Sequence, residues 1–334
     1  MKKIVVIGGG TGTFTVLSGL KKYPQFELSA IVSMMDSGGS NRVIRDEFGL
    51  LPTSDIRQVM VALASNSSDR VLRKLFTYRY SKGKGISGMT FGNLFMAALS
   101  DIYKGDQRKA IEETCKILNV SGDIIPVTYD KTDLVATYAN GNKVSGEHNI
   151  DEPKKSQGEF KITQLEVVPS AKANKDAITA ISDADYVILG PGDFYTSTLS
   201  NVVVGNISSA LKKTRANIIF IVNLMTKFGE TNGFKATDFI YEIKKYIGRA
   251  PDVVIIDNSD SFPEKIIEKY KTENARPVED DLGADNPILK DITIIRKKIV
   301  SDRVYSKAKS DILKRSLIRH DSVKLARVIL EYCG

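Results

Sequence analysis

Residues 4–13 read Ile4-Val5-Val6-Ile7-Gly8-Gly9-Gly10-Thr11-Gly12-Thr13, an apolar run followed directly by a glycine cluster. The run is typical of a buried strand, and residues 13–22 have the periodicity of a helix. Glycine permits the tight turn between them, and backbone N–H groups at a helix N-terminus attract anions. No Gly-Lys-Ser/Thr follows, so the turn is not a P-loop, and a purely structural turn is the alternative. The stretch predicts phosphate contacts at Gly8, Gly9, Gly10, Thr11, Gly12 and Thr13.

The rest of the chain repeats this alternation of apolar strands and helices. Further strand-like runs lie at residues 30–33, 186–189, 218–223 and 253–257. Helical patterns lie at residues 55–65, 92–102, 108–118, 174–182, 237–247 and 309–332. Strands that are apolar throughout are covered on both faces. The alternation therefore predicts an α/β fold of the Rossmann-like, doubly wound type, with a mostly parallel sheet.

The middle of the chain has a different pattern. Residues 123–168 hold short alternating runs, and Asn140-Gly141 is a hairpin turn signal. This segment predicts a small antiparallel insertion or an extension of the sheet. The sequence shows no internal repeat and no low-complexity linker, so residues 1–334 are expected to form a single composite domain.

Composition limits the classes of partner. The formal charge is +8, but lysines and arginines stand among acidic residues and tryptophan is absent, which disfavours a nucleic-acid surface. No apolar segment approaches the length of a membrane span, so we expect a cytoplasmic protein without a membrane partner. Cys115 and Cys333 are too far apart to suggest a disulfide framework or zinc site. His148 is expected on the surface, and His320 is expected to cap or pair locally.

A second glycine-containing turn follows the second strand. It reads Met35-Asp36-Ser37-Gly38-Gly39-Ser40-Asn41-Arg42, at the sheet edge where α/β folds bind ligands. Asp36 could hold a ribose hydroxyl, a magnesium ion or a reacting hydroxyl group. We predict ligand contacts at Gly38, Gly39 and Ser40. A turn stabilised by the Asp36 side chain, without a ligand, is the alternative.

A later turn repeats the arrangement of strand, glycine and helix. Residues 187–197 include Gly190-Pro191-Gly192-Asp193 and place hydroxyl groups at the start of a helix. They predict a second phosphate site at Gly190, Gly192, Asp193, Thr196 and Ser197. The next strand ends near Asn223 and Thr226, which could read a base, a sugar or an acyl group, although turn formation explains them equally well. Arg57, on the first turn of a helix capped by Ser54 or Asp55, could reach a phosphate.

Taken in order, these motifs resemble one family. The motifs are Gly8 to Gly12, Asp36 to Ser40, Arg45-Asp46-Glu47-Phe48-Gly49, Pro52 to Arg57, Gly92-Asn93-Leu94, Gly190 to Gly192, Thr226 to Thr231 and Arg319-His320-Asp321. The family holds the 2-phospho-L-lactate transferases and the bacterial gluconeogenesis factors (CofD/YvcK). The resemblance implies that Asn93 completes the pocket.

The two branches of that family imply different functions. The transferases work with magnesium in deazaflavin coenzyme synthesis, whereas the gluconeogenesis-factor branch resembles a UDP-sugar-binding regulator of cell shape and carbon use. The Asp-Ser-Gly-Gly-Ser form and the Gly-Glu-Thr turn at residues 229–231 are closer to the second branch. Family members of this kind often associate, so a homodimer is expected.

The chain departs from the family pattern at three places. It has Arg42-Val43-Ile44-Arg45 where Gly-Arg-Leu-Arg is usual, Pro52-Thr53-Ser54-Asp55 for Pro-Pro-Gly-Asp, and Gly88-Met89-Thr90 for Gly-His-Ser. The first change displaces an arginine, the second removes a glycine and the third removes an imidazole. Ligand binding survives such changes more readily than chemistry does.

Three functional hypotheses follow. The first is a regulator that binds a nucleotide-sugar of the UDP-sugar type and needs no cofactor for binding. The second is a magnesium-dependent phosphoryl-group transferase acting on a deazaflavin-type hydroxyl, in which Asp36 binds magnesium or accepts the proton and Arg57 or Arg45 neutralises charge. The third, a nicotinamide-dependent dehydrogenase, is disfavoured because Gly-Gly-Ser after Asp36 and a second phosphate turn fit it poorly.

Overall fold

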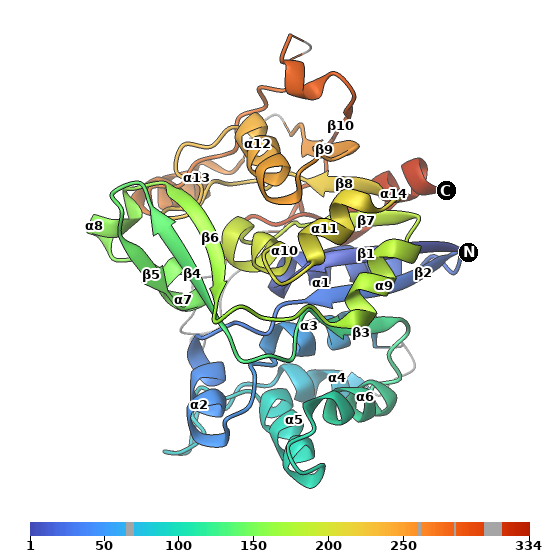
Figure 1. The fold of residues 1–334 in the computed structure, drawn as a ribbon, viewed down its shortest axis with the longest axis vertical. Helices are drawn as coiled ribbons and strands as arrows, with labels where there is room; N and C mark the ends of the chain where they lie inside the picture. Colours follow the sequence, from blue (N-terminus) through green and yellow to red (C-terminus); the bar gives the residue numbers. More distant parts are fainter. Residues whose placement is uncertain (65–69, 260–261, 284, 304–315) are drawn as a thin grey trace.

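The structure is a computed structural model that describes residues 1–64, 70–259, 262–283, 285–303 and 316–334. Within these residues the centre of the molecule is a seven-stranded sheet with helices on both faces (Figure 1). Every strand pair in it is parallel. The predicted doubly wound parallel sheet is therefore confirmed. In sheet order the strands are β10 (Thr293–Lys297), β9 (Val253–Asp257), β8 (Asn217–Ile221), β7 (Tyr186–Leu189), β1 (Lys2–Gly8), β2 (Phe26–Val32) and β3 (Asp123–Pro126).

The strand order creates a switch point between β1 and β7. From β1 the chain proceeds outward through β2 to β3, then returns to β7 and proceeds outward in the opposite direction. Ile7 of β1 pairs with Leu189 of β7, so the two glycine turns that follow these strands leave the sheet side by side. In doubly wound sheets, ligands bind in the crevice at this point.

Alternate residues of the strands enter two apolar cores. Ile4 and Val6 of β1 are buried against α1 (Gly10–Leu20), α3 (Ser54–Leu63) and α14 (Ser322–Cys333). Val5 and Ile7 are buried on the other face, in the core that includes α9 (Lys175–Asp183), α11 (Ile207–Lys213) and α12 (Ala236–Ile247). Burial on both faces explains why the strand sequences are apolar at almost every position.

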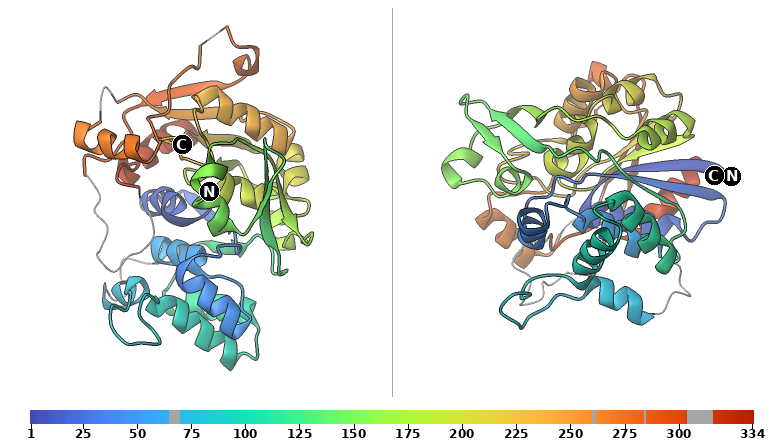
Figure 2. Two further views of the ribbon diagram at one scale, coloured as in Figure 1. Left: turned by 90° about the vertical axis from the view of Figure 1, so that its left-hand side faces the viewer. Right: turned by 60° about the horizontal axis from the view of Figure 1, so that its bottom comes forward.

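Four further helices gather beyond β3. They are α2 (Gly39–Phe48), α4 (Arg70–Thr77), α5 (Phe91–Ile102) and α6 (Gln107–Ile117). With α3 they form one group below the sheet in Figure 1, and both views of Figure 2 show the same group. Contacts of α5 with α2, α4 and α6 hold the group together. A π-helical turn, η1 (Phe194–Leu199), and the short α10 (Ser200–Val202) follow β7, and α13 (Glu264–Thr272) follows β9.

The predicted helix at residues 309–332 is wrong in its first part. Helix α14 begins at Ser322, and the side chain of Asp321 caps it by accepting hydrogen bonds from the backbone N–H groups of Val323 and Lys324. Residues 316–321 are not helical, and His320 pairs with Val300 through the backbone. Residues 309–315 of the prediction lie outside the described residues. Asparagine and aspartate favour N-caps, so Asp321 is the signal for the start of the helix that the periodicity concealed.

A three-stranded antiparallel sheet lies beside the main sheet, as predicted, but it begins later. It consists of β5 (Lys143–Ser145), β4 (Asp133–Tyr138) and β6 (Ile162–Val168), with α7 (Glu147–Asp151) and α8 (Lys155–Gly158) between β5 and β6. The predicted segment started at Asp123, whereas residues 123–126 are β3 and pair in parallel with β2. Leu134 and Tyr138 of the small sheet are buried in the same core as β7 and β8.

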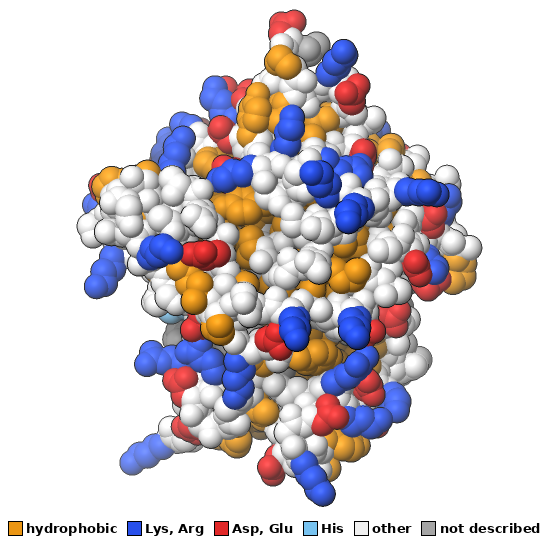
Figure 3. Space-filling model, in the orientation of Figure 1, with side chains coloured by type: hydrophobic (Ala, Val, Ile, Leu, Met, Phe, Trp, Pro, Cys, Tyr) orange, Lys and Arg blue, Asp and Glu red, His pale blue; other side chains and the backbone are white. Residues whose placement is uncertain are grey.

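The surface carries charges of both signs. On the face shown in Figure 3, lysine and arginine side chains are spread over the whole molecule, with acidic side chains among them. Among the helices of the described residues, none combines the length and apolar character required to cross a bilayer.

Gly19 allows α1 and α14 to pack closely, which yields a prediction about stability. A Cβ atom at Gly19 would lie 2.1 Å from the carbonyl oxygen of Ser322 and 2.8 Å from Cβ of Ala326. We expect Gly19→Ala to lower the free energy of unfolding by about 1–3 kcal/mol, the usual cost of overpacking. Urea unfolding measures the change. Gly85→Ala, at a site with open space around it, is the control and should change little; equal losses in both variants would contradict the packing argument.

Candidate functional site

A crevice of about 440 Å³ lies at the carboxyl ends of β1, β2, β7 and β8. Its walls come from the two glycine turns, the start of α3, helix α7 of the antiparallel unit and the segment after β8. Most residues predicted to contact a ligand line it. They are Gly9, Gly10, Thr11, Gly12, Asp36, Gly38, Gly39, Arg57, Gly192, Asp193, Ser197, Asn223 and Thr226.

The two glycine turns touch each other. A Cβ atom at Gly12 would lie 1.8 Å from the carbonyl oxygen of Pro191, so only glycine allows the first turn of α1 to approach the second turn. Nδ2 of Asn223 donates to the carbonyl oxygen of Gly192 at 2.7 Å, which ties β8 to the same point. The two predicted phosphate turns therefore form one continuous wall.

Asp55 is a site residue that the sequence analysis considered only as a helix cap. A Cβ atom at Gly9 would lie 2.1 Å from Oδ2 of Asp55, and the Asp55 carboxyl accepts a hydrogen bond from the backbone of Gly10. Asp55 thus stands at the N-terminus of α1, where a negative charge is favourable. Burial, and then the nearby charge of Asp36, raise its pKa to about 7.

A chain of side-chain hydrogen bonds holds Asp36 in place. Its Oδ1 accepts from the backbone N–H of Gly38 at 2.8 Å, and its Oδ2 accepts from Nδ2 of Asn41 at 2.6 Å. Oγ of Ser54 donates to Oδ1 of Asn41 at 2.9 Å, and Nδ2 of Asn93 donates to Oγ of Ser54 at 2.9 Å. Burial raises the pKa of Asp36 although these bonds oppose it.

Arg57 forms the last link of this network, on the side away from Asp36. Its Nε donates to Oδ1 of Asn93 at 2.8 Å, and a terminal nitrogen donates to the carbonyl oxygen of Phe76 at 3.1 Å. The side chain is buried but still borders the crevice. Arg57 therefore positions the Asp36 network and lowers the pKa of Asp55 against the effect of burial.

The opposite wall holds an acidic cluster around Lys227, which we call the lysine-centred cluster: Lys227, Asp151, Asp193 and Glu230. Nζ of Lys227 lies 3.0 Å from Oδ1 of Asp193 and 3.3 Å from Oε1 of Glu230, and it also contacts Oδ1 of Asp151. Burial raises the pKa of Glu230 to about 7. Burial alone would lower the pKa of Lys227, but the three carboxylates outweigh it and raise that pKa.

Several predicted residues stand behind the wall of the crevice. Asn93 is fully buried within the network, and Thr196 donates to Oε1 of Glu230 at 3.0 Å and to Oδ1 of Asp151 at 3.3 Å. Thr13 is fully buried beneath Gly8, whose Cβ would lie 2.6 Å from its Oγ1. Gly190 directly follows β7, and the crevice lining begins at the next residue of the turn, Pro191. The side chain of Ser40 lies outside the described part of the structure.

Two of the three departures from the family pattern, at residues 42–45 and 88–90, lie away from the crevice, whereas Ser54 of the third lines it and bonds to Asn41. Arg42 is largely exposed and pairs with Asp46 at 3.6 Å. Arg45 pairs with Asp46 and, at 3.4 Å, with Asp133 of the antiparallel unit. Met89 is buried. The structure thus gives Arg45 a role in joining two parts of the fold and does not bring it to the crevice.

Helix α7 contributes residues that the sequence analysis missed. Glu147, His148 and Asp151 line the crevice, so His148, which was expected on the surface, is partly exposed and borders the candidate site. The backbone N–H of His148 donates to Oγ of Ser37 at 3.0 Å, which docks α7 on the Asp36 turn. Glu147 and Asp151 are four residues apart and so share one helical face, the one local signal that pointed to them.

His320 borders the far end of the crevice and is buried. Burial lowers its pKa to about 4, although a hydrogen bond to the backbone of Val222 and the charge of Asp257 oppose the shift. Within the described ranges of the chain, no group hydrogen-bonds to its Nε2. The imidazole is thus neutral near pH 7, and its hydrogen bond to the backbone of Val222 holds it in place.

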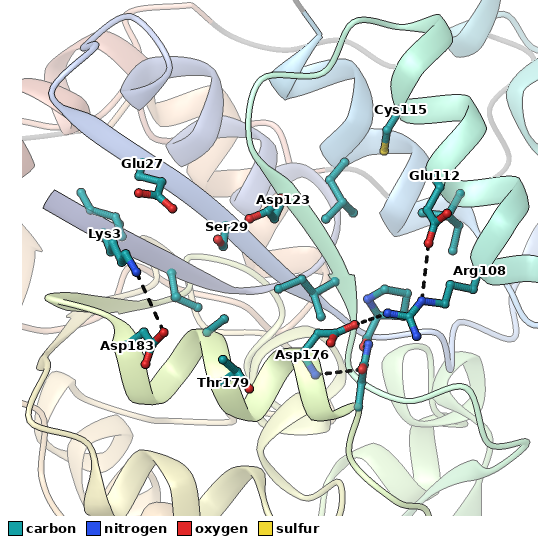
Figure 4. A pocket seen from close by; sticks show the side chains of 18 of the residues that line it. Lys3, Glu27, Ser29, Arg108, Glu112, Cys115, Asp123, Asp176, Thr179 and Asp183 are labelled. Atoms are coloured by element: carbon teal, nitrogen blue, oxygen red, sulfur yellow. Dashed lines mark hydrogen bonds and ion pairs between the residues drawn. The ribbon is translucent and has the colours of Figure 1, made fainter. Parts of the chain in front are cut away.

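A second cavity, of about 650 Å³, lies on the sheet between α6 and α9 (Figure 4). It begins near the amino ends of β1, β2 and β3, opposite the ligand-binding edge. Five of its charged side chains pair with one another: Lys3 with Asp183 at 3.9 Å, and Arg108 with Asp176 at 2.5 Å and Glu112 at 3.5 Å. Burial raises the pKa of Cys115 to about 12, so it is not a reactive thiol. The crevice is the stronger candidate for a functional site.

The fold and the crevice define a doubly wound α/β protein whose candidate ligand site lies at the switch point of the sheet. Residues 4–300 match the model of the family described as 2-phospho-L-lactate transferase CofD. The chain belongs to this family.

Named relatives cover almost the whole chain. It is 33% identical to the gluconeogenesis factor of Bacillus subtilis, over 98% of this chain and 97% of that protein. It is 34% identical to the gluconeogenesis factor of Halalkalibacterium halodurans, over 99% and 96%. A crystal structure of a UPF0052 family protein from Bacillus halodurans is similar with a TM-score of 0.86 and 32% identity, covering 98% of each chain.

The raised pKa of Asp55 yields a prediction about pH dependence. Its folded pKa is about 7, whereas an unfolded aspartate titrates near 3.9, so the folded state holds the proton more tightly. The charged form therefore costs stability, increasingly from about pH 4 to pH 7. We expect Asp55→Asn to match the unmodified protein at pH 4 and to exceed its free energy of unfolding by about 1–3 kcal/mol at pH 8.

Urea unfolding at pH 4, 6 and 8 measures this difference. Asp46→Asn is the control, because the side chain of Asp46 is half exposed whereas that of Asp55 is buried. A difference between Asp55→Asn and the unmodified protein that does not change with pH would contradict the prediction.

Proposed function

We propose that the crevice binds a nucleotide-sugar of the UDP-sugar type and that the protein acts as a regulator of carbon metabolism and cell shape. The observation that carries the proposal is the contact between the two glycine turns at the switch point, with carboxylates facing them. The gluconeogenesis factors among the relatives support the regulatory branch.

The phosphates are proposed to bind along the wall formed by the two turns. Asp55 already accepts from the backbone of Gly10, and Glu230 accepts from that of Tyr195. The phosphates are therefore proposed to bind the backbone N–H groups of Thr11 and Gly12 on the first turn of α1. Arg79 and Arg319 line the same crevice and supply positive charge. Asp55 carries a proton for part of the time near pH 7, which reduces its repulsion of a phosphate.

The sugar is proposed to lie against the carboxylates. Asp36 is held as an acceptor by Gly38 and Asn41. Burial raises the pKa of Glu147 well above its ordinary value, so its carboxyl group can donate as well as accept, and sugar hydroxyls bind both kinds of group. The base is proposed to lie at the other end, where Leu224, Ala275 and Ile318 form an apolar surface beside Tyr270. An apolar lining with a few placed polar groups is typical of a small-molecule site.

A ligand screen with a matched pair of variants tests this proposal. We expect a UDP-sugar to raise the melting temperature of the purified protein more than UDP, GDP, GTP or NAD, because binding to the folded state stabilises it. Ser197→Phe fills the crevice and should abolish the shift. Thr179→Phe makes the same change in the second cavity (Figure 4) and should preserve it.

Two results would refute the nucleotide-sugar proposal. One is the absence of stabilisation by any UDP-sugar. The other is equal loss of the shift in Ser197→Phe and Thr179→Phe, which would place the ligand outside the crevice.

The alternative is a magnesium-dependent transfer of a phospho-lactyl group to a deazaflavin-type hydroxyl. The family description and the position of Asp36 beside the phosphate wall favour it. In that reaction the acceptor oxygen would bond to the phosphorus of the nucleotide-activated phospho-acid, and the P–O bond to the nucleoside monophosphate would break. Asp36, held by Gly38 and Asn41, would accept the proton of the acceptor hydroxyl. Asp36 is also the residue that would contact magnesium, which takes oxygen ligands and keeps several waters.

The transferase alternative predicts that Asp36→Asn abolishes product formation, because an amide cannot accept the proton. Product is measured by mass spectrometry with guanosine- and uridine-activated phospho-acid donors and magnesium. Asp46→Asn should retain full activity. No turnover by the unmodified protein with any such donor would exclude the alternative and leave the regulator.

A further inference from the structure

Lys227 stands where a metal ion would stand in its cluster. In the described part of the chain, Asp151, Asp193 and Glu230 form the group whose carboxylate oxygens lie close enough, within 4.8 Å of one another, to share one cation. The ammonium nitrogen of Lys227 contacts one oxygen of each. The ammonium donates a hydrogen bond to Asp151 and forms ion pairs with Asp193 and Glu230.

Two of the three carboxylates, those of Glu230 and Asp151, also accept hydrogen bonds from groups other than Lys227. Glu230 is fully buried and accepts from the backbone N–H of Tyr195 at 2.8 Å and from Oγ1 of Thr196 at 3.0 Å. Oγ1 of Thr196 also donates to Asp151 at 3.3 Å. These bonds hold Glu230 and Asp151 in place and leave each carboxylate a free lone pair, so the position in front of them is filled by the ammonium of Lys227, where a magnesium ion would need its shell of oxygens at about 2.0–2.1 Å.

The cluster joins three separate parts of the fold. Asp151 ends α7 of the antiparallel unit, Asp193 follows the Gly190-Pro191-Gly192 turn, and Lys227 and Glu230 lie after β8. An ammonium on a flexible stem supplies the positive charge that these three acidic segments need in order to meet. The residues therefore do not fit a divalent ion in addition to Lys227, because both cations would occupy one position.

We infer that Lys227 is the resident cation of the lysine-centred cluster and that it excludes divalent metal ions from it. Lys227 is thus the residue that decides whether this wall of the crevice holds an ammonium or a metal. One consequence rests on the proposed function: a nucleotide-sugar would bind beside the ammonium without a metal at this wall.

Manganese binding to the full chain without nucleotide tests the inference. We expect Lys227→Met, which keeps the length of the side chain and removes the charge, to gain one Mn²⁺ site that is at least tenfold tighter than any in the unmodified protein. Electron paramagnetic resonance of free Mn²⁺ measures the affinity. Lys245→Met is the control, because Lys245 pairs with Glu242 at 3.0 Å on the surface and its loss should create no such site.

A second pair of variants locates the gained site. Lys227→Met combined with Glu230→Gln should lose it, because a required carboxylate is gone. Lys227→Gln keeps N–H donors without charge and replaces Lys227→Met if circular dichroism shows that the latter does not fold. An unchanged Mn²⁺ affinity in the folded Lys227 variant, or an equally tight site in the unmodified protein that Glu230→Gln removes, would overturn the inference.

The result is separable from the proposed function. If no UDP-sugar stabilises the unmodified protein, the proposed function fails and the Mn²⁺ comparison still decides the role of Lys227. If a UDP-sugar binds, its affinity for the unmodified protein should be equal in EDTA and in Mn²⁺. Tenfold or greater weakening by EDTA, together with loss of Mn²⁺ binding in Glu230→Gln, would show a metal at this wall and refute the inference.

Discussion

The contact between Gly12 and Pro191 is the constraint on which the crevice depends. Because no side chain separates the first turn of α1 from the second glycine turn, β1 and β7 can lie side by side and bring both turns to one wall. Asn223 bonds to Gly192 and extends the wall to β8. A larger residue at position 12 would separate the turns, so this glycine serves the fold and the site together.

Carboxylates face that wall, and the protein holds them there at a cost in stability. Burial raises the pKa values of Asp36, Asp55 and Glu230, which means that their charged forms are disfavoured in the folded state. The hydrogen-bond network behind Asp36 and the ammonium of Lys227 offset part of this cost. Strongly shifted carboxyl groups gathered in a crevice are typical of functional sites.

The fold could be predicted from local patterns because the buried strands are short, apolar and followed by glycines. The same patterns placed Asp36 and the two turns at one edge of the sheet. They could not reveal Glu147 and Asp151, since these residues reach the crevice only through the docking of α7 on Ser37, a contact across more than one hundred residues of sequence. Nor could they show that Asn93 and Arg57 support Asp36 from below, because that depends on how α3 and α5 pack.

The kind of ligand that the crevice can bind depends on whether its positive charges come from side chains or from a metal ion. A phosphate wall facing carboxylates needs positive charge between them, and a protein can take it from a bound metal or from its own side chains. Here Lys227 already joins three carboxylates, and Arg57 lies under Asp55. Lys227 therefore supplies, from the chain itself, part of the positive charge that a bound metal would otherwise bring to this wall. An ammonium already in that position agrees better with the proposed ligand-binding regulator than with a transferase that holds a metal at this cluster.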